Sequence, residues 1–488
     1  MSAFDLLVRG GHVVTATGVA RVDVAVLDGI VVEIGPELPG TAGEEVDAAG
    51  LHVLPGLVDP HVHLNDPGRR DWEGFASGTA AFAVGGGTCL FDMPLNAHPP
   101  TLDGASFDRK LEAAAGAAHV DFCLWGGLVP GDLDRLDDLA ERGAVGFKAF
   151  MCASGIDDFE AADDLTLLEG MRRAAALGLP VAVHAENDAI TRGLAARAVA
   201  AGRTAVADYL GSRPAVAEIE AVARAVALAG EAGCSLHIVH VSTGAAAAVV
   251  AEARARGVDV TCETCPHYLA LTAEDAERLG AVAKCAPPLR PATEQEALWR
   301  RVLDGDVAIV ASDHSPAPPA LKRGEDAFSV WGGISGCQTT LRVVLAESEA
   351  RGLTLPRVAS LTAASAAERF GIAGKGVVAV GRDADLALVD VAYEAALGAG
   401  ELLYRHPHSP FVGRRLRGRV VRTILRGQTA AAEGRAVGAP RGRLVRPERR
   451  PAPGHGLPAA LRPDRMAMVE TGQGQVAPRL ARDEEEIR

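Results

Sequence analysis

The sequence predicts an α/β protein, a (β/α)₈ TIM-like barrel with a small β-sandwich domain built from both chain ends. Short apolar runs alternate with Ala-, Leu-, Glu- and Arg-rich stretches through the middle of the 488 residues. Near-continuous apolar strands that alternate with helices are typical of a parallel sheet covered on both faces, and eight such units favour a closed barrel. Valine-rich segments broken by glycine and proline stand at both ends of the chain.

The two end segments predict the smaller domain. Residues 1–55 alternate and turn quickly, as in DLLVRGGHVV and VDVAVLDGIVVEIGP. A similar texture returns at residues 375–440, in GVVAVGRDADLALVD and GRVVRTILRGQ. Short Val- and Ile-rich runs between glycines indicate β-structure, and β segments from opposite chain ends can pair. We therefore expect residues 1–55 and 375–440 to form one sandwich beside the central domain.

Residues 56–374 predict the barrel. The helical stretches between its strands include 108–118, 163–178, 214–232 and 244–256. The alternative is a doubly wound open sheet, but the chain shows no Gly-rich dinucleotide fingerprint that would support it. The eight predicted strands are 57–64, 88–94, 119–128, 144–151, 180–185, 235–242, 258–264 and 307–313.

Charge and composition narrow the classes of partner. The formal net charge of −14 argues against nucleic acid and anionic membranes. The eight cysteines are scattered, and the N-terminus MSAFDLLVRGGHVV lacks the apolar core of a secretory signal, so we expect a cytoplasmic protein. Residues 441–488 are rich in proline, arginine and charge, which predicts an extended or disordered tail.

Residues that can bind metal end several of the predicted strands. The C-terminal ends of barrel strands converge on one face, where barrel enzymes carry their active sites. Four imidazoles, a carboxylate and a lysine would meet there and form a hydrolytic metal centre. They are His61 and His63 in VDPHVHL, Lys148 in VGFKAF, His184 in VAVHAEN, His240 in LHIVHVS and Asp313 in IVASDHS.

The spacing of residues along a strand predicts which of these side chains point to the same face of the sheet. His61 and His63 are two apart, so both imidazoles point the same way and can reach one ion. A bare His-x-His is more often incidental, and the other strand-end residues give it weight. His237 lies three positions before His240, so we expect it to face the opposite side, as a packing or surface residue.

Lys148 and Asp313 add chemistry to the imidazoles. Asp313 can bind a metal and accept a proton from its water, although alone it would suggest a loop cap. A desolvated Lys148 can lose its proton, take up carbon dioxide and bridge two ions as a carbamate; its alternative is an amine that reaches solvent. Two ions that share one water lower its pKa and polarise a carbonyl, which suits hydrolysis of a C–N bond. No GxSxG elbow or Cys–His nucleophile competes with this interpretation.

Six separate motifs carry a family resemblance that spans about residues 3–440. HVHLNDPGR, HAEN at 184–187, ETCPHY, KCAPPLR, SDHSPAPPALK and WGGISGCQ together resemble the amidohydrolase superfamily. Within it they are most similar to the allantoinase group of the cyclic amidohydrolases. The resemblance implies hydrolysis of allantoin to allantoate, a small-molecule substrate and a homotetramer.

The same resemblance implies the roles of individual residues. It implies two divalent ions, usually zinc, bridged by a carboxylated Lys148. One ion would be held by His61, His63 and Asp313, and the other by His184 and His240. Asp313 would be the general base, and Asn65, Asn96 and Cys285 would contact the substrate.

Other members of this group remain alternatives. Dihydroorotases carry an arginine where this chain has Asn65, and an amide cannot neutralise the carboxylate of their substrate. Hydantoinases and dihydropyrimidinases carry a tyrosine where this chain has Ala153. Asn65 and Asn96 have the simpler interpretation of loop caps. A catalytically inactive scaffold is the alternative from another class, and the six filled ligand positions argue against it.

Overall fold

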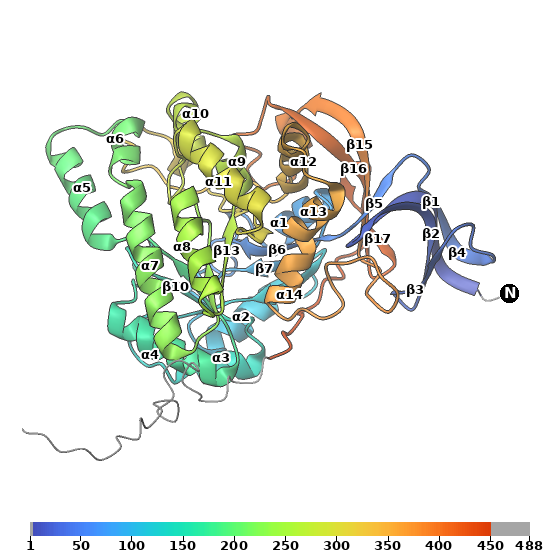
Figure 1. Ribbon diagram of the computed structural model, residues 1–488, viewed down its shortest axis with the longest axis horizontal. Coiled ribbons are helices and arrows are strands. Elements are labelled where there is room, and N and C mark those ends of the chain that lie inside the picture. The colour runs from blue at the N-terminus through green and yellow to red at the C-terminus, as the bar shows by residue number, and fades with distance from the viewer. Residues whose placement is uncertain (1–2, 450–488) are drawn as a thin grey trace, which may run out of the picture. The chain divides into compact units, whose positions relative to one another are not determined.

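The computed structural model describes residues 3–449, and a set of short strands lies at its centre among the helices (Figure 1). All eight predicted strands form, the third of them in two parts, β8 and β9. They are β6 (Leu57–Val62), β7 (Gly87–Asp92), β8 (Asp121–Leu124), β9 (Gly126–Gly127), β10 (Phe147–Phe150), β11 (Val181–His184), β12 (Leu236–Ile238), β13 (Val260–Thr264) and β14 (Ile309–Val310).

The central strands form two parallel sheets that together close into a ring. One has the order β6-β7-β8 and the other the order β14-β13-β12-β11-β10-β9. Backbone hydrogen bonds join them at both edges, from Val145 N to Leu124 O at 2.9 Å and from His63 N to His314 O at 2.8 Å. A parallel bridge between Val62 and His314 supports the second junction.

Helices cover the outside of the ring (Figure 1). The longer ones are α1 (Phe75–Val84), α2 (Gly104–Ala114), α3 (Arg135–Arg142), α4 (Asp164–Leu177), α5 (Asp188–Ala200), α7 (Ala215–Ala232), α8 (Gly244–Ala255), α11 (Ala292–Asp304) and α12 (Thr340–Arg351). Shorter ones are α6 (Val206–Gly211), α9 (Pro266–Ala270), α10 (Ala273–Leu279), η1 (Gly280–Ala283), η2 (Pro319–Lys322), α13 (Leu355–Ala359), η3 (Ser360–Ala364), α14 (Ser365–Arg369) and η4 (Ala399–Glu401).

One helix is displaced from its predicted range. The sequence predicts a helix over 108–118, and α2 begins four residues earlier. Asp103 caps it: its side chain accepts from Ser106 N at 2.8 Å, and Ser106 Oγ accepts from Asp103 N at 3.0 Å. This reciprocal pair satisfies backbone donors at the helix start.

Two apolar cores follow from the alternation of side chains along the strands. One faces the helices and contains Phe147, Val181 and Val183. The other contains Val58, Phe91, Trp125, Val145, Ala182, Val239 and Ile309, which lie on or next to strands around the ring, together with Phe370 after α14. Because successive strand residues point to opposite faces, the second set fills the inside of the ring.

A nine-stranded sheet stands beside the ring and combines strands from residues 3–55 and 386–436 (Figure 1). Its order is β18-β17-β16-β15-β5-β1-β2-β3, with β4 pairing with β1. The two ends meet where β5 pairs antiparallel with β15, with Leu54 opposite Ala387. Its strands are β1 (Ala3–Thr15), β2 (Gly18–Leu27), β3 (Ile30–Gly35), β4 (Thr41–Asp47), β5 (His52–Pro55), β15 (Leu386–Ala396), β16 (Arg415–Leu425), β17 (Gln428–Ala432) and β18 (Arg435–Ala436).

Residues 441–449 run extended along the barrel. Gly442 N donates to Ala118 O at 2.8 Å, and Phe122 N donates to Arg443 O at 3.0 Å. The remainder of the predicted tail, 450–488, lies outside the described residues. Within residues 3–449, no helix combines the length and the apolar character needed to span a bilayer.

Candidate metal centre

The structure brings the six predicted metal ligands to one end of the ring. Lys148 and His184 lie on β10 and β11, and His61 lies on β6. His63, His240 and Asp313 follow β6, β12 and β14 within a few residues. All six are buried, with Asp313 the most exposed at 8%. These positions are at the C-terminal ends of the strands, as a barrel active site requires.

Three of the ligands converge on one point. His61 Nε2 and His63 Nε2 lie 3.2 Å and 3.5 Å from the same Asp313 oxygen, Oδ1. Burial opposes ionisation of Asp313, but the nearby imidazoles lower its pKa below the ordinary value. Two nitrogens and an anionic oxygen at this separation are a donor set that suits zinc.

The other two histidines lie against this group. The ring of His240 is 5.3 Å from that of His61 and 4.6 Å from that of His184, centroid to centroid. Burial lowers the pKa of His240 well below its usual value, so the ring is neutral and can donate a lone pair to a metal. Its Nδ1 is buried without a hydrogen-bond partner among the described residues.

Lys148 is a buried amine without a polar partner. It is 0% exposed, and its Nζ has no hydrogen-bond partner in the described part of the chain. Nζ lies 4.6 Å from the centroid of the Phe150 ring. Burial lowers the pKa of Lys148 to about 7, which makes the neutral amine readily accessible. A buried amine without a polar partner among the described residues, surrounded by imidazoles, fits a site that is completed by a carbamate and metal ions.

The backbone is strained at several of these positions. His240 and Asp313 have φ angles of 40° and 44°, and Asn65 and Asn96 have φ angles of 63° and 66°. A non-glycine residue in the left-handed region costs about 1–3 kcal/mol, and such residues cluster at active sites. The left-handed turn at His240 also breaks the alternation of β12, so parity along that strand does not predict where its imidazole points.

His237 shows the consequence, because it does not face away from the site. It is fully buried, and its Nε2 lies 3.0 Å from Glu263 Oε2. The other oxygen, Oε1, lies 2.6 Å from His61 Nδ1. The predicted direction of the side chain is therefore wrong, and so is the surface alternative, whereas the packing alternative agrees with its burial: His237 lies inside the ring and shares a carboxylate with a predicted ligand.

Glu263 was missed by the sequence analysis, although it stands in the quoted motif ETCPHY. Burial would raise the pKa of Glu263, but the contacts with His61 and His237 lower it to about 2. A carboxylate that accepts from Nδ1 leaves Nε2 of His61 free for a metal and fixes the ring orientation. The signal in the sequence was a charged residue inside the apolar run of β13.

Glu186 has the same relation to His184. Its Oε2 lies 2.8 Å from His184 Nε2, and it forms a buried ion pair with Arg213. Cys152 brings its sulfur within 4.8 Å of the facing atoms of both His184 and Glu186. Burial raises the pKa of the Cys152 thiol to about 12, so it stays protonated and is a poor metal ligand. Glu186 therefore orients His184 and leaves Nδ1 for a metal.

The three predicted substrate contacts differ in their hydrogen bonds. Asn65 Nδ2 donates to Pro316 O at 3.3 Å, while its Oδ1 is buried without a partner among the described residues. The residue before Asn96 offers its carbonyl to His63 Nδ1 at 3.4 Å. Cys285 is buried, and its carbonyl accepts from Tyr209 Oη at 2.9 Å.

Comparison with known proteins agrees with this geometry. The model of the Amidohydrolase family matches residues 52–430. An allantoinase of Rubrobacter xylanophilus is 64% identical over 92% of this chain and 99% of its own length. An allantoinase of Solibacter usitatus is 54% identical over 91% of this chain and 97% of its own. The solved L-hydantoinase (dihydropyrimidinase) of Arthrobacter aurescens is 36% identical, with a TM-score of 0.88 over 91% of this chain and 100% of that one.

The chain therefore belongs to the amidohydrolase family. Within that family it groups with the allantoinases, whose curated members match it over most of its length. The predicted resemblance and the predicted fold class are confirmed, and the prediction of a hydrolase is confirmed with them.

Proposed function

We propose that this protein opens the hydantoin ring of allantoin to give allantoate, with two divalent ions held by the six predicted ligands. The observation that carries the proposal is Lys148, a buried amine without a polar partner that lies among four imidazoles and Asp313. A buried, unpaired ammonium is costly. Addition of carbon dioxide to the neutral amine, with loss of one proton, gives a carbamate whose two oxygens can each bind an ion.

The ligand set divides between the two ions. His61, His63 and Asp313 would hold one, and His184 and His240 the other, with the Lys148 carbamate between them. Zinc fits these nitrogen and oxygen donors. When bound, the ions supply Lewis acidity toward the substrate carbonyl and lower the pKa of water. Glu263 and Glu186 keep the imidazoles of His61 and His184 in the orientation that the ions need.

Asp313 would move the proton. Its low pKa keeps it ionised, and the carboxylate accepts a proton from the attacking water. The water oxygen forms a bond to the ring carbonyl carbon, and the C–N bond of the cyclic amide breaks. Asp313 then returns that proton to the departing nitrogen. The other proton of the water is released to solvent, so the single ring-opened product carries a carboxylate and a free ureido group.

Allantoin suits the side chains at the substrate side. It is uncharged, and its ureido arm can donate to the unpaired Oδ1 of Asn65. An amide at that position, and Ala153 where a hydantoinase has tyrosine, favour a neutral ring with polar arms. We extend the proposal to contacts from Asn96 and Cys285. The homotetramer and the cytoplasmic location remain predictions.

A turnover panel tests the substrate assignment. Allantoin, hydantoin, dihydrouracil and dihydroorotate are offered to the zinc-loaded enzyme, and kcat/KM is measured for each. A site built to hydrogen-bond polar groups rejects analogues that lack them, because its own groups stay unpaired. We expect allantoin to be hydrolysed far faster than hydantoin or dihydrouracil, with no measurable cleavage of dihydroorotate. Comparable rates for dihydroorotate and allantoin would overturn the assignment.

A further inference from the structure

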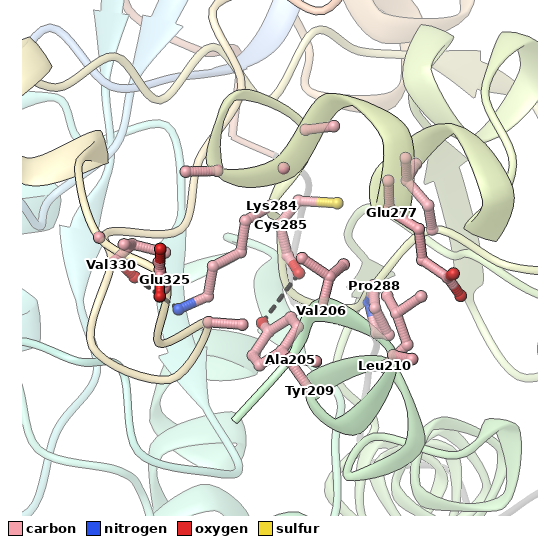
Figure 2. Close-up of a pocket in the computed structure, with 18 residues that line it drawn as sticks. Ala205, Val206, Tyr209, Leu210, Glu277, Lys284, Cys285, Pro288, Glu325 and Val330 are labelled. Carbon is pink, nitrogen blue, oxygen red and sulfur yellow. Dashed lines mark hydrogen bonds between the residues drawn. The ribbon is translucent and has the colours of Figure 1, made fainter. Parts of the chain in front are cut away.

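A cavity of about 430 Å³ lies apart from the six predicted ligands, none of which belongs to its described lining (Figure 2). Helix α6, the end of α10, η1 and the loop at 324–330 form its walls. Its volume is within the range of small-molecule sites. Cys285, a predicted substrate contact, also belongs to this lining.

Lys284 places a positive charge in this cavity. Its Nζ lies 4.6 Å from the centroid of the Tyr209 ring, and it donates to Val330 O at 2.5 Å. Figure 2 shows the side chain extending from the Cys285 segment toward Val330. Among the described residues no carboxylate lies within 4.0 Å of Lys284 Nζ, and Asp326 acts on its charge only from further away. An ammonium has three donors, so Lys284 can bind a further acceptor.

The rest of the lining selects the size and the polarity of a ligand. Small apolar side chains such as Val206, Leu210 and Ala283 surround the charge. Two exposed carboxylates, Glu277 and Glu325, also belong to the lining. Lys284 would attract a simple anion, but the two carboxylates would repel it. A molecule that carries a carboxylate and N–H donors satisfies both.

We propose that this cavity binds a small carboxylate that also carries amide or ureido N–H groups. The carboxylate would bind Lys284, and the N–H groups would bind Glu277 and Glu325. The ring-opened product has this chemistry, so the enzyme's own product is the ligand we assign, a choice that rests on the proposed function.

Contacts lead from this cavity to a predicted metal ligand. Two cations lie over the ring of Tyr209: Lys284 Nζ is 4.6 Å from its centroid, and the guanidinium carbon of Arg213 is 5.7 Å from it. Arg213 pairs with Glu186, which in turn contacts His184 at 2.8 Å. A carboxylate that draws Lys284 away from Tyr209 removes one of the two cations on that ring. In this proposal, product in the cavity alters the contacts of Arg213 and Glu186, changes the orientation of His184, and so slows turnover.

Binding stoichiometry tests the site directly. Allantoate is titrated into the zinc-loaded enzyme by calorimetry. We expect two molecules per chain, one at the metal centre and one in the cavity, and one per chain in Lys284→Met. Arg278→Met removes an exposed cation outside the cavity, from α10, the helix that carries Glu277, and this variant should still bind two. One molecule per chain in the unchanged enzyme, or two in Lys284→Met, would overturn the proposal.

Inhibition kinetics give a second test that does not depend on Lys284. Ala207 is exposed and lines the cavity, so Ala207→Trp should block it without disturbing the core. Added product should raise the apparent KM and lower the apparent kcat of the unchanged enzyme, but only raise KM in Ala207→Trp. The same fall in kcat in both would contradict the proposal. Failure of allantoin turnover would instead overturn the proposed function, and the titration would then use the ring-opened product of the true substrate.

Discussion

Two groups of buried side chains in this protein look alike by distance and differ in what balances their charge. His61, His63 and Asp313 bring their ligand atoms within 4.8 Å of one another, and so do Asp121, Asp383 and Asp385. In the acidic group, Lys375 Nζ lies 2.7 Å, 2.7 Å and 2.9 Å from Asp121, Asp385 and Asp383. Arg426 pairs with Asp121 as well.

The difference separates a structural cluster from a functional one. The acidic group carries its own cations, so it joins the barrel strand β8 to the end sheet and needs no ion. The histidine group stands beside Lys148, an amine that has no polar partner among the described residues. Distance between ligand atoms is therefore a weaker criterion for a metal site than the polar atoms that stay unsatisfied.

The largest expected effect comes from a substitution beside the histidine cluster, at Lys148. Lys148→Ala removes the proposed bridge and should abolish nearly all turnover. A short carboxylic acid such as acetate should restore part of it, because the acid can occupy the position of the carbamate. Lys148→Arg should not be rescued, because its cation still fills the site. Full activity of Lys148→Ala in a turnover assay would mean that another group bridges the ions.

Asp313→Asn should have the second-largest effect on turnover. The amide keeps the size of the side chain and cannot accept a proton. General acid–base catalysis contributes about 10²–10⁴-fold, so kcat should fall by at least that order. The unfolding midpoint should change little by comparison. A kcat within threefold of the unchanged enzyme would exclude the assigned role.

Lys375→Met tests whether the acidic cluster is structural. Removal of one partner from a buried ion pair costs about 3–5 kcal/mol, because the remaining charges stay uncompensated. We expect a loss of stability of that size in chemical denaturation, with kcat per folded molecule unchanged. The exposed pair of Arg172 and Glu231 provides a control, since Glu231→Gln should change stability by less than about 1 kcal/mol. A fall in kcat with unchanged stability would reverse the interpretation of this cluster.

Glu186→Gln should have the smallest effect. The amide keeps a hydrogen-bonding atom near His184 but loses the charge that balances Arg213. Loss of such an orienting group typically costs about 10–100-fold in metal affinity. Competition with a coloured chelator measures the zinc affinity, again with Glu231→Gln as the control. Equal affinities in the two variants would show that Glu186 does not orient the ligand.

The barrel and its metal ligands could be predicted because they leave strong local patterns. Buried parallel strands are short apolar runs, and the ligands interrupt those runs at their ends, as His184 does on β11. Contacts between strands leave no such pattern. Glu263 on β13 contacts His237 on the neighbouring strand β12 and His61 on β6, and nothing in its own segment indicates either partner.

Backbone conformation sets another limit to prediction. The alternation rule placed His237 on the wrong side because it assumed a regular strand as far as His240. The strand ends at Ile238, and the left-handed turn at His240 redirects its imidazole. The start of α2 differs for a comparable reason, since the cap at Asp103 acts before the helical pattern becomes visible.

Elemental analysis of the purified, active enzyme tests the central claim most directly. The account predicts two divalent ions per chain, loss of turnover when a chelator removes them, and recovery when zinc, cobalt or manganese is added. Lys148→Ala should retain fewer ions than the unchanged enzyme under the same conditions. Full turnover by enzyme that contains less than one ion per chain would contradict the account.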